Sequence, residues 1–327
     1  MTDHTNNPNF RYPNDNRDFT PGEFDYPSQQ EIDRTAQKGD RTYYPNDNGG
    51  YYANSNRENI SIVDPVNKEQ PPNSNVKIDA KPWTPSEIST LLWYDASDLS
   101  TITSSSNIIS QVDDKSGNDI HLNIITVGKF GPKTGIRSLN GMNVFSWDSA
   151  DQILENNSFF HDQANTALFV AIVFKADLDG NQDFLLAGTE SAVPGERMSI
   201  RRLHTGDRMQ ILGGSNTGSN IPLTSDLNTS KEGQDTIVLV KMNSSTSAIR
   251  INGEFKKSGN IGTNVLDSLN IGGNALESSN INGYIAEIIS FTNSSQQLIV
   301  EGYLAHKWAL QSKLPSSHLY RNSEPTL

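Results

Sequence analysis

The chain has 327 residues, enough for one large domain with an appended segment. Its net charge of −12 argues against binding nucleic acid through the phosphates and against attraction to anionic membranes. The absence of cysteine excludes a disulfide framework and thiolate metal sites. No apolar run reaches membrane-spanning length, and the first residues lack the apolar stretch of a secretory signal. Apolar content is only 34%, so we expect part of the chain to lie outside any core.

Residues 1–80 differ in composition from the rest of the chain. Asn, Asp, Pro, Tyr and Arg dominate, and the apolar residues follow neither helical nor strand periodicity. The segment repeats Tyr12-Pro13-Asn14-Asp15-Asn16 as Tyr44-Pro45-Asn46-Asp47-Asn48, with Tyr26-Pro27 between the two copies. Each Tyr-Pro pair is predicted to be extended, because proline disfavours helix at the residue before it. We therefore expect an extended arm that binds neighbouring subunits at these residues, the alternative being a solvated tail.

From Trp83 onward, short apolar segments alternate with clusters of Gly, Asn, Asp and Ser, which is typical of strands and turns. The run 167–174 is apolar on both faces and is predicted to be a central strand, while Asn252-Gly253 predicts a hairpin turn. The predicted strands are 91–95, 108–113, 120–124, 142–147, 167–174, 183–187, 198–203, 209–212, 236–242, 248–252, 268–271 and 284–291.

A helix is predicted over 296–311, after the capping residues Asn293, Ser294 and Ser295 and before Pro315. Its apolar residues form a wide face that another layer must cover. Many strands followed by one late helix predict an antiparallel sandwich or jelly roll with the helix packed on it as a lid.

These residues also carry a family resemblance. Gly283-Tyr-Ile-Ala-Glu-Ile-Ile, Glu301-Gly-Tyr-Leu-Ala-His-Lys-Trp and Leu314-Pro-Ser-Ser-His318 resemble the closing signature of concanavalin A-like (LamG-like) jelly-roll domains. Trp83-Thr-Pro, Leu92-Trp-Tyr-Asp-Ala96 and Asp114-Lys-Ser-Gly-Asn118 resemble their opening. The resemblance covers about residues 83–320, and Leu319 departs from it by replacing the usual proline. It implies an all-β concanavalin A-like jelly roll at 81–322, followed by a tail at 323–327.

The sequence offers little for catalysis. Glucanases of the resembled fold carry a Glu-x-Asp-x-(x)-Glu run, which is absent here, and no Gly-x-Ser-x-Gly elbow is present. Glu287 is the best lone carboxylate, and we expect it to be structural, paired under the lid helix with His306, Lys307 or backbone. No catalytic residue is therefore assigned, and the chain is not expected to be an enzyme.

One acidic turn could hold a metal ion. Asp113, Asp114, Asn118 and Asp119 supply the hard oxygen ligands that suit Ca²⁺, although the same sequence also forms ordinary turns. No histidine pair has zinc-ligand spacing, and no other cofactor is expected. Among aromatic residues that could contact sugars, Tyr94 and Trp147 are more often core in such strands, whereas Phe159 and Phe160 are predicted to lie in a loop.

Such domains are common in bacteriophage structural proteins and bacterial surface proteins. The resemblance therefore suggests a virion structural protein, either a capsid decoration or a tail-associated protein. In this view the arm binds capsid or tail subunits and the chain is oligomeric within the particle, which is assembled in the host cytoplasm and released by lysis. The alternatives are a receptor-binding tail fibre or adhesin that recognises cell-surface glycans, and then a glycosidase. Neither nucleic acid nor a membrane is expected as a partner.

Overall fold

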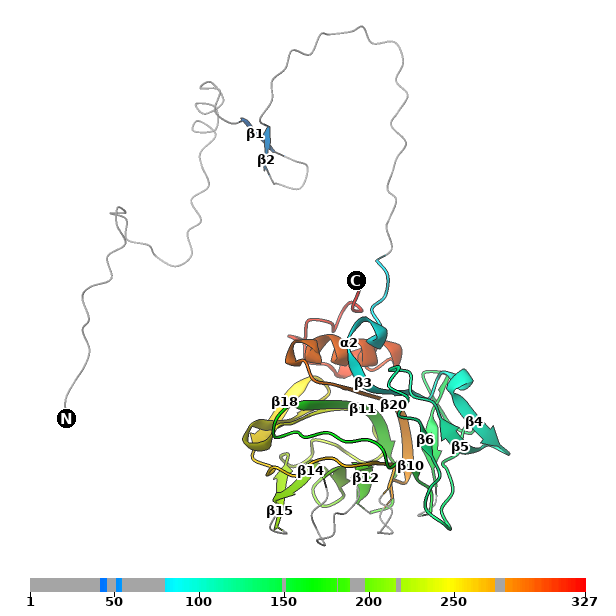
Figure 1. Cartoon of the computed structure of the whole chain (residues 1–327). Coiled ribbons are helices and arrows are strands. Elements are labelled where there is room, and N and C mark those ends of the chain that lie inside the picture. The colour runs from blue at the N-terminus through cyan, green and yellow to red at the C-terminus, as the bar shows by residue number, and fades with distance from the viewer. Residues whose placement is uncertain are drawn as a thin grey trace, which may run out of the picture. The chain divides into compact units, whose positions relative to one another are not determined.

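We analysed a computed structural model of the chain (Figure 1). It describes residues 80–148, 151–180, 182–188, 198–215, 219–273 and 280–327, together with strands β1 (Thr42–Pro45) and β2 (Tyr51–Asn54). The chain divides into two units, Met1–Val76 and Lys77–Leu327.

In the first unit, β1 and β2 form an antiparallel pair in which Tyr44 lies opposite Tyr52. The sequence interpretation expected an extended arm and missed this hairpin. The signal was present, because Asn48-Gly49 between the two strands is a common hairpin turn sequence.

The second unit is an antiparallel β-sandwich (Figure 1). The strands of its larger sheet are, in spatial order, β15 (Ser219–Thr224), β14 (Arg208–Ser215), β13 (Ser199–Leu203), β12 (Asp183–Ala187), β19 (Leu269–Ile271), β10 (Leu154–Asn156), β6 (Leu122–Asn123), β5 (Ile108–Val112) and β4 (Ile102–Ser105). Those of the smaller sheet are β18 (Glu254–Gly259), β17 (Ser247–Ile251), β16 (Thr236–Met242), β11 (Leu168–Ala176), β20 (Gly283–Phe291) and β3 (Thr90–Asp95), and β9 (Phe145–Trp147) also pairs with β20. A separate short pair joins β7 (Ser138–Leu139) to β8 (Met142–Asn143).

Strand alternation divides the apolar residues of the smaller sheet between two cores. On β11, Val170, Ile172 and Phe174 face the larger sheet, where they pack with residues such as Leu186 and Ile211. The alternate residues of β11 face the opposite side of the sheet. The central strands β11 and β20 are therefore buried on both faces, which the sequence predicted for β11.

Helix α2 (Gln297–Lys307) covers the outer face of the smaller sheet (Figure 1). It follows a 3₁₀ turn, Ser294–Gln296, which is capped by the Asn293 side chain. Its Val300, Leu304 and the following Trp308 are fully buried against Phe169, Leu239 and Phe291 and their neighbours. The predicted lid helix is confirmed, but it ends four residues earlier than predicted, because Ala309 adopts a positive φ of 58°.

The residues of the predicted tail, 323–327, contact the start of the sandwich unit. Leu327 donates its backbone N–H to Lys81 O, and Trp83 donates to Pro325 O, so the two ends of the sandwich unit pair with each other. Trp83 is buried and packs edge-on against Tyr303 of α2, with ring centroids 5.6 Å apart.

Candidate functional site

Glu287 is the centre of a polar network beneath α2. It lies on β20 with no exposed surface, and four side chains donate hydrogen bonds to its carboxylate. Oε1 accepts from Trp93 Nε1 at 2.7 Å and from Tyr303 Oη at 3.0 Å. Oε2 accepts from Trp308 Nε1 at 2.8 Å and lies 2.8 Å from Lys307 Nζ.

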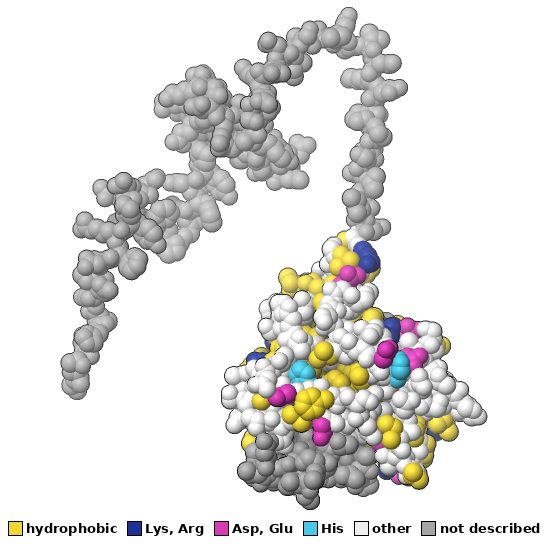
Figure 2. All heavy atoms as spheres, in the orientation of Figure 1, with side chains coloured by type: hydrophobic (Ala, Val, Ile, Leu, Met, Phe, Trp, Pro, Cys, Tyr) yellow, Lys and Arg dark blue, Asp and Glu magenta, His cyan; other side chains and the backbone are white. Residues whose placement is uncertain are grey.

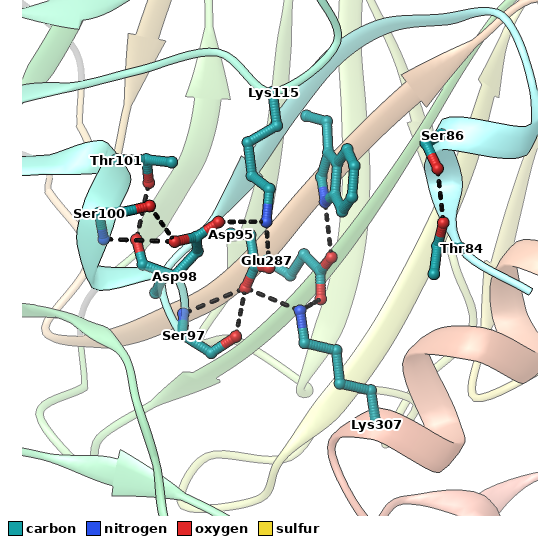
Figure 3. A network of polar contacts seen from close by, with 12 residues as sticks. Thr84, Ser86, Asp95, Ser97, Asp98, Ser100, Thr101, Lys115, Glu287 and Lys307 are labelled. Carbon is teal, nitrogen blue, oxygen red and sulfur yellow. Dashed lines mark hydrogen bonds and ion pairs between the residues drawn. The ribbon is translucent and has the colours of Figure 1, made fainter. Parts of the chain in front are cut away.

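Lys307 extends this network to a second carboxylate. Its ammonium lies 2.7 Å from Asp95 Oδ1, and Lys115 Nζ lies 3.0 Å from Asp95 Oδ2 and 2.7 Å from Asp98 Oδ2 (Figure 3). The Lys115 ammonium also lies over the Trp93 ring, 4.4 Å from the centroid. Two lysines thus alternate with three carboxylates from β3, β20 and the turn after β3, so each carboxylate lies beside an ammonium group.

The pKa shifts follow from this geometry. Burial raises the pKa of Glu287, although Lys307 opposes the shift. Burial also acts on Asp95, but there the ammonium groups outweigh it and lower the pKa. The hydrogen bond from Lys115 is the main cause that lowers the pKa of Asp98, to about 2.

A second buried carboxylate fixes the chain after the helix. Glu301 on α2 forms a two-point ion pair with Arg250, at 2.8 and 2.9 Å, and its Oε2 lies 3.3 Å from His318 Nε2. A Cβ on the neighbouring Gly302 would approach Tyr320 Cβ to 2.5 Å, so glycine is needed for this close packing. His306 contacts Tyr320 O at 2.7 Å and does not contact Glu287.

The closing signature is therefore a set of packing and charge contacts that join α2 to the sheet and to the residues that follow. Glu287 pairs with Lys307, as expected, and its carboxylate has no open approach for a substrate. The sequence interpretation missed the other partners: Trp93 comes from β3, far along the chain, and Tyr303 and Trp308 come from α2 and its end. The spacing of Tyr303, Lys307 and Trp308 places them on one side of the helix, which was the available signal.

The predicted calcium turn has a different arrangement. Asp114 Oδ1 accepts from the backbone N–H groups of Trp93 and Ser116 at 2.9 Å, and Oδ2 accepts from Ser116 Oγ at 2.6 Å and from Ile120 N. Asn118 donates to Thr90 O and Leu91 O. Asp113 contacts Gln111, while the Asp119 side chain is 89% exposed.

The turn thus fastens itself to the edge of β3. In the part of the chain that the structure describes, no three His, Cys, Asp or Glu side chains gather as they would around a metal ion. The calcium prediction therefore gains no support from this geometry.

The arm residues fall mostly outside the described residues. Tyr44 and Pro45 lie in β1, whereas Tyr12, Pro13, Asn14, Asp15, Asn16, Tyr26, Asn46, Asp47 and Asn48 are outside the described part of the chain. Of the aromatic residues considered for sugars, Tyr94, Trp147 and Phe159 are buried, and Phe160 is 64% exposed.

A row of residues, all of them polar except Ala187, crosses the face of the larger sheet that points away from the inner core. Strand pairing aligns Gln111, Asn123, Glu155, Asn270, Ala187 and Ser199, on the face opposite the inner residues Leu154, Leu186 and Ile200. Glu155 accepts hydrogen bonds from the Thr126 hydroxyl and from Ile125 N and Thr126 N. Asn270 is only 1% exposed, and neither atom of its amide has a partner among the described residues.

A surface groove of about 460 Å³ lies beside the β4–β5 hairpin. Its lining combines serine hydroxyls with apolar side chains: Ser105, Ser106, Ile108, Ile109, Ser110, Ile124, Lys129, Phe130 and Gly131. Elsewhere, on the face shown in Figure 2, charged side chains are scattered among uncharged ones. No described helix is both long and apolar enough to cross a bilayer.

No protein-family model matches the sequence, and no curated protein matches it. Several solved structures are similar in fold. A sialidase from Trypanosoma rangeli has 15% identity and a TM-score of 0.42, over 63% of this chain and 31% of that one. Domain 4 of AbnA, a GH43 extracellular arabinanase from Geobacillus stearothermophilus, solved with arabinotriose, has 13% identity and a TM-score of 0.43, over 62% and 92%. The botulinum neurotoxin serotype G binding domain has 11% identity and a TM-score of 0.45, over 68% and 51%.

The chain thus spans about a third of the sialidase and about half of the toxin domain. Likenesses this distant carry no conclusion about function.

Proposed function

We propose that the chain is a non-enzymatic structural protein of a bacteriophage particle. Residues 1–80 attach it to capsid or tail subunits, and the sandwich is the module displayed on the surface. The closing signature resembles domains that are common in bacteriophage structural proteins, and this supports the assignment to a bacteriophage particle. The observation that carries the proposal is that the folded cores and the Tyr-Pro repeats occupy different parts of the chain. Both described cores consist only of residues from Trp83 onward, whereas the Tyr-Pro repeats all lie before it.

The buried carboxylates support a structural role for the sandwich. Glu287 and Glu301 are each neutralised by a cation and have no exposed surface. Glycosidases need two carboxylates roughly 5–9 Å apart across an accessible sugar bond. The proposal predicts no turnover on a panel of polysaccharides, and a turnover lost in Glu287→Gln would contradict it.

Location can be tested directly. Particles released by lysis of cells that carry the natural gene should be purified on a density gradient and labelled with gold-conjugated antibody against the sandwich. We expect gold at regular positions on the particles and co-migration of the chain with the shell proteins. Recovery only in the particle-free fraction would contradict the proposal.

A further inference from the structure

Lys307 joins two buried carboxylates that lie opposite each other on neighbouring strands. Glu287 on β20 is the strand partner of Asp95 on β3. Like charges directly opposite each other destabilise a strand pair. The Lys307 ammonium lies 2.7 Å from Asp95 Oδ1 and 2.8 Å from Glu287 Oε2 (Figure 3). One amine group therefore contacts a carboxyl group and, beside it, a second carboxylate that can accept a proton.

These three groups are withdrawn from water. The Glu287 side chain has no exposed surface, and the side chains of Asp95 and Lys307 are 6% and 16% exposed. The rings of Tyr303 and Trp308 have their centroids 5.5 and 5.1 Å from the Lys307 ammonium. Condensation of an amine with a carboxylic acid releases water, so a site from which water is excluded favours the amide over its hydrolysis.

We propose that Lys307 and Asp95 condense into an isopeptide bond within the chain, with Glu287 moving the protons. The contact between Lys307 Nζ and Asp95 Oδ1 is the reactant arrangement, because it holds the nitrogen beside the carboxyl carbon. The Ser97 N–H and hydroxyl both donate to Asp95 Oδ1 and fix the orientation of the carboxyl group. Reactants held in such near-attack contact behave as if their concentration were about 10⁵–10⁸ M.

The reaction balances without an external reagent. The Lys307 ammonium transfers one proton to Asp95 Oδ1, which leaves a neutral amine and a carboxylic acid. Nζ then forms a bond to Cγ, and the negative charge that develops on Oδ2 is stabilised by the Lys115 ammonium, 3.0 Å away. Glu287 takes a second proton from the nitrogen and delivers it to Oδ1, the Cγ–Oδ1 bond breaks, and Oδ1 leaves as water. The charges of Lys307 and Asp95 are both lost, nothing is oxidised or reduced, and Glu287 and Lys115 are unchanged.

Two pKa shifts agree with these roles. Burial raises the pKa of Glu287, which suits a group that accepts a proton and then releases it. Burial acts on Asp95 as well, but the charge of Lys307 outweighs it and lowers the pKa. Asp95 therefore begins as the carboxylate and receives its proton from Lys307.

The bond would give this chain a covalent cross-link that it cannot obtain from cysteine, which its sequence lacks. It would join β3, at the start of the sandwich unit, to the end of α2. The loop closed in this way contains most of the unit, and a cross-link restricts the unfolded chain more when the loop is longer. The lid helix would then stay attached to the sheet even when its packing contacts open.

The intact mass of the purified full chain tests the proposal. We expect the parent chain, after denaturation, to be lighter by one water molecule than the mass calculated from its residues. Lys307→Arg is the matched control, because it keeps a cation at this site but removes the amine, and it should show no loss of water. Tandem mass spectrometry of a protease digest should find one branched peptide that joins residues 95 and 307.

Three results would overturn the proposal. A parent chain with its full calculated mass would mean that Lys307 and Asp95 form an ion pair only. A loss of water that persists in Lys307→Arg would place the modification elsewhere. A branched peptide that joins Lys307 to Glu287, or Lys115 to Asp95, would show that the reacting pair is a different one.

The role of Glu287 is measured by the rate of the mass change in freshly translated full chain. Glu287→Gln, in chains whose circular dichroism matches that of the parent, should form the bond at least tenfold more slowly. Glu254→Gln, at an exposed side chain, is the control and should react at the parent rate. A folded Glu287→Gln chain that reacts at the parent rate would overturn this role. The mass of the parent needs no variant, so it decides whether the bond exists even where Glu287→Gln does not fold.

This inference goes beyond the proposed function and does not depend on it. The reaction occurs once in each chain, between the chain's own side chains, so it is not turnover of a substrate. A chain that enters particles without the bond would remove only this inference. A chain that carries the bond but is absent from particles would remove only the proposed function.

Discussion

At the scale of single residues, Glu287 shows why an acidic residue in a motif is not by itself evidence of catalysis. Its two oxygens receive two indole N–H groups, a phenol and an ammonium, all within 3.0 Å. A carboxylate with all of these partners is a structural anion. The free-energy cost of burying its charge is offset only while every partner stays in place.

Glu287→Gln should therefore be strongly destabilising. The amide has nearly the same volume, but it removes the negative charge and directs an N–H toward groups that already donate. Breaking a buried charge pair costs about 3–5 kcal/mol, which urea denaturation can measure. Glu254→Gln, at an exposed side chain, is the control. A loss below about 1 kcal/mol for Glu287→Gln would mean that the network is not essential.

We expect Asp98 to contribute to the stability of the fold in a way that depends on pH. Its pKa is lowered from 3.8 to about 2 in the folded state, chiefly by the Lys115 hydrogen bond. A lowered pKa contributes stability that is present above the unfolded value and is lost as pH falls through the folded value. The difference in melting temperature between the parent chain and Asp98→Asn should thus shrink between about pH 5 and pH 2.

Lys115→Met should reduce the same pH dependence, because it removes the cation that causes it. A difference that stays constant over this pH range would show that the Asp98 carboxylate gains nothing from Lys115.

At the scale of elements, the long apolar strands and the lid helix could be predicted, because periodicity and composition specify them locally. Strands β12 and β16 have the predicted bounds. Short strands such as β10, with three residues, carry too few positions for a period, and β18 reads as polar because it lies at an edge. The end of α2 was missed because the positive φ of Ala309 depends on tertiary packing, and Pro315 lies farther along the chain.

The residues of the candidate site also divide into those that the sequence indicated and those that it could not. The sequence indicated that Glu287 pairs under the lid with His306, Lys307 or backbone, and the structure shows that Lys307 is the partner among these. The sequence could not identify Asp95, Lys115 or Trp93 as members of the network, because strand pairing and packing of distant segments bring them there.

Replacement of Trp308, at the end of the lid helix, should strongly reduce the stability of the domain. This residue is fully buried, packs in the outer core and donates a hydrogen bond to Glu287. Trp308→Ala should cost about 3–5 kcal/mol. In a domain of this size that lowers the melting temperature by roughly 10 °C, measurable by circular dichroism. Trp308→Phe should retain part of the packing, so its melting temperature should lie between those of the parent chain and Trp308→Ala. An unchanged melting temperature for Trp308→Ala would contradict the burial of this face.

At the scale of the whole molecule, the sandwich unit contains everything that its fold requires. Its two cores, its charge networks and the pairing of residues 81–83 with 325–327 use only residues after position 80. A chain of residues 80–327 should therefore unfold cooperatively near the melting temperature of the full chain. Removal of 325–327 should in turn destabilise the first residues of the unit, because Trp83 and Lys81 lose their backbone partners.

The central claim is that the arm, and not the sandwich, attaches the chain to its particle. The most direct measurement counts copies per purified particle after complementation with the full chain, with residues 80–327, and with the Tyr12→Ala/Tyr44→Ala double variant. We predict normal occupancy for the full chain, none for residues 80–327, and a greater loss for the double variant than for either single change, because two anchors bind with avidity. Normal occupancy of particles by residues 80–327 would contradict the account and assign attachment to the sandwich.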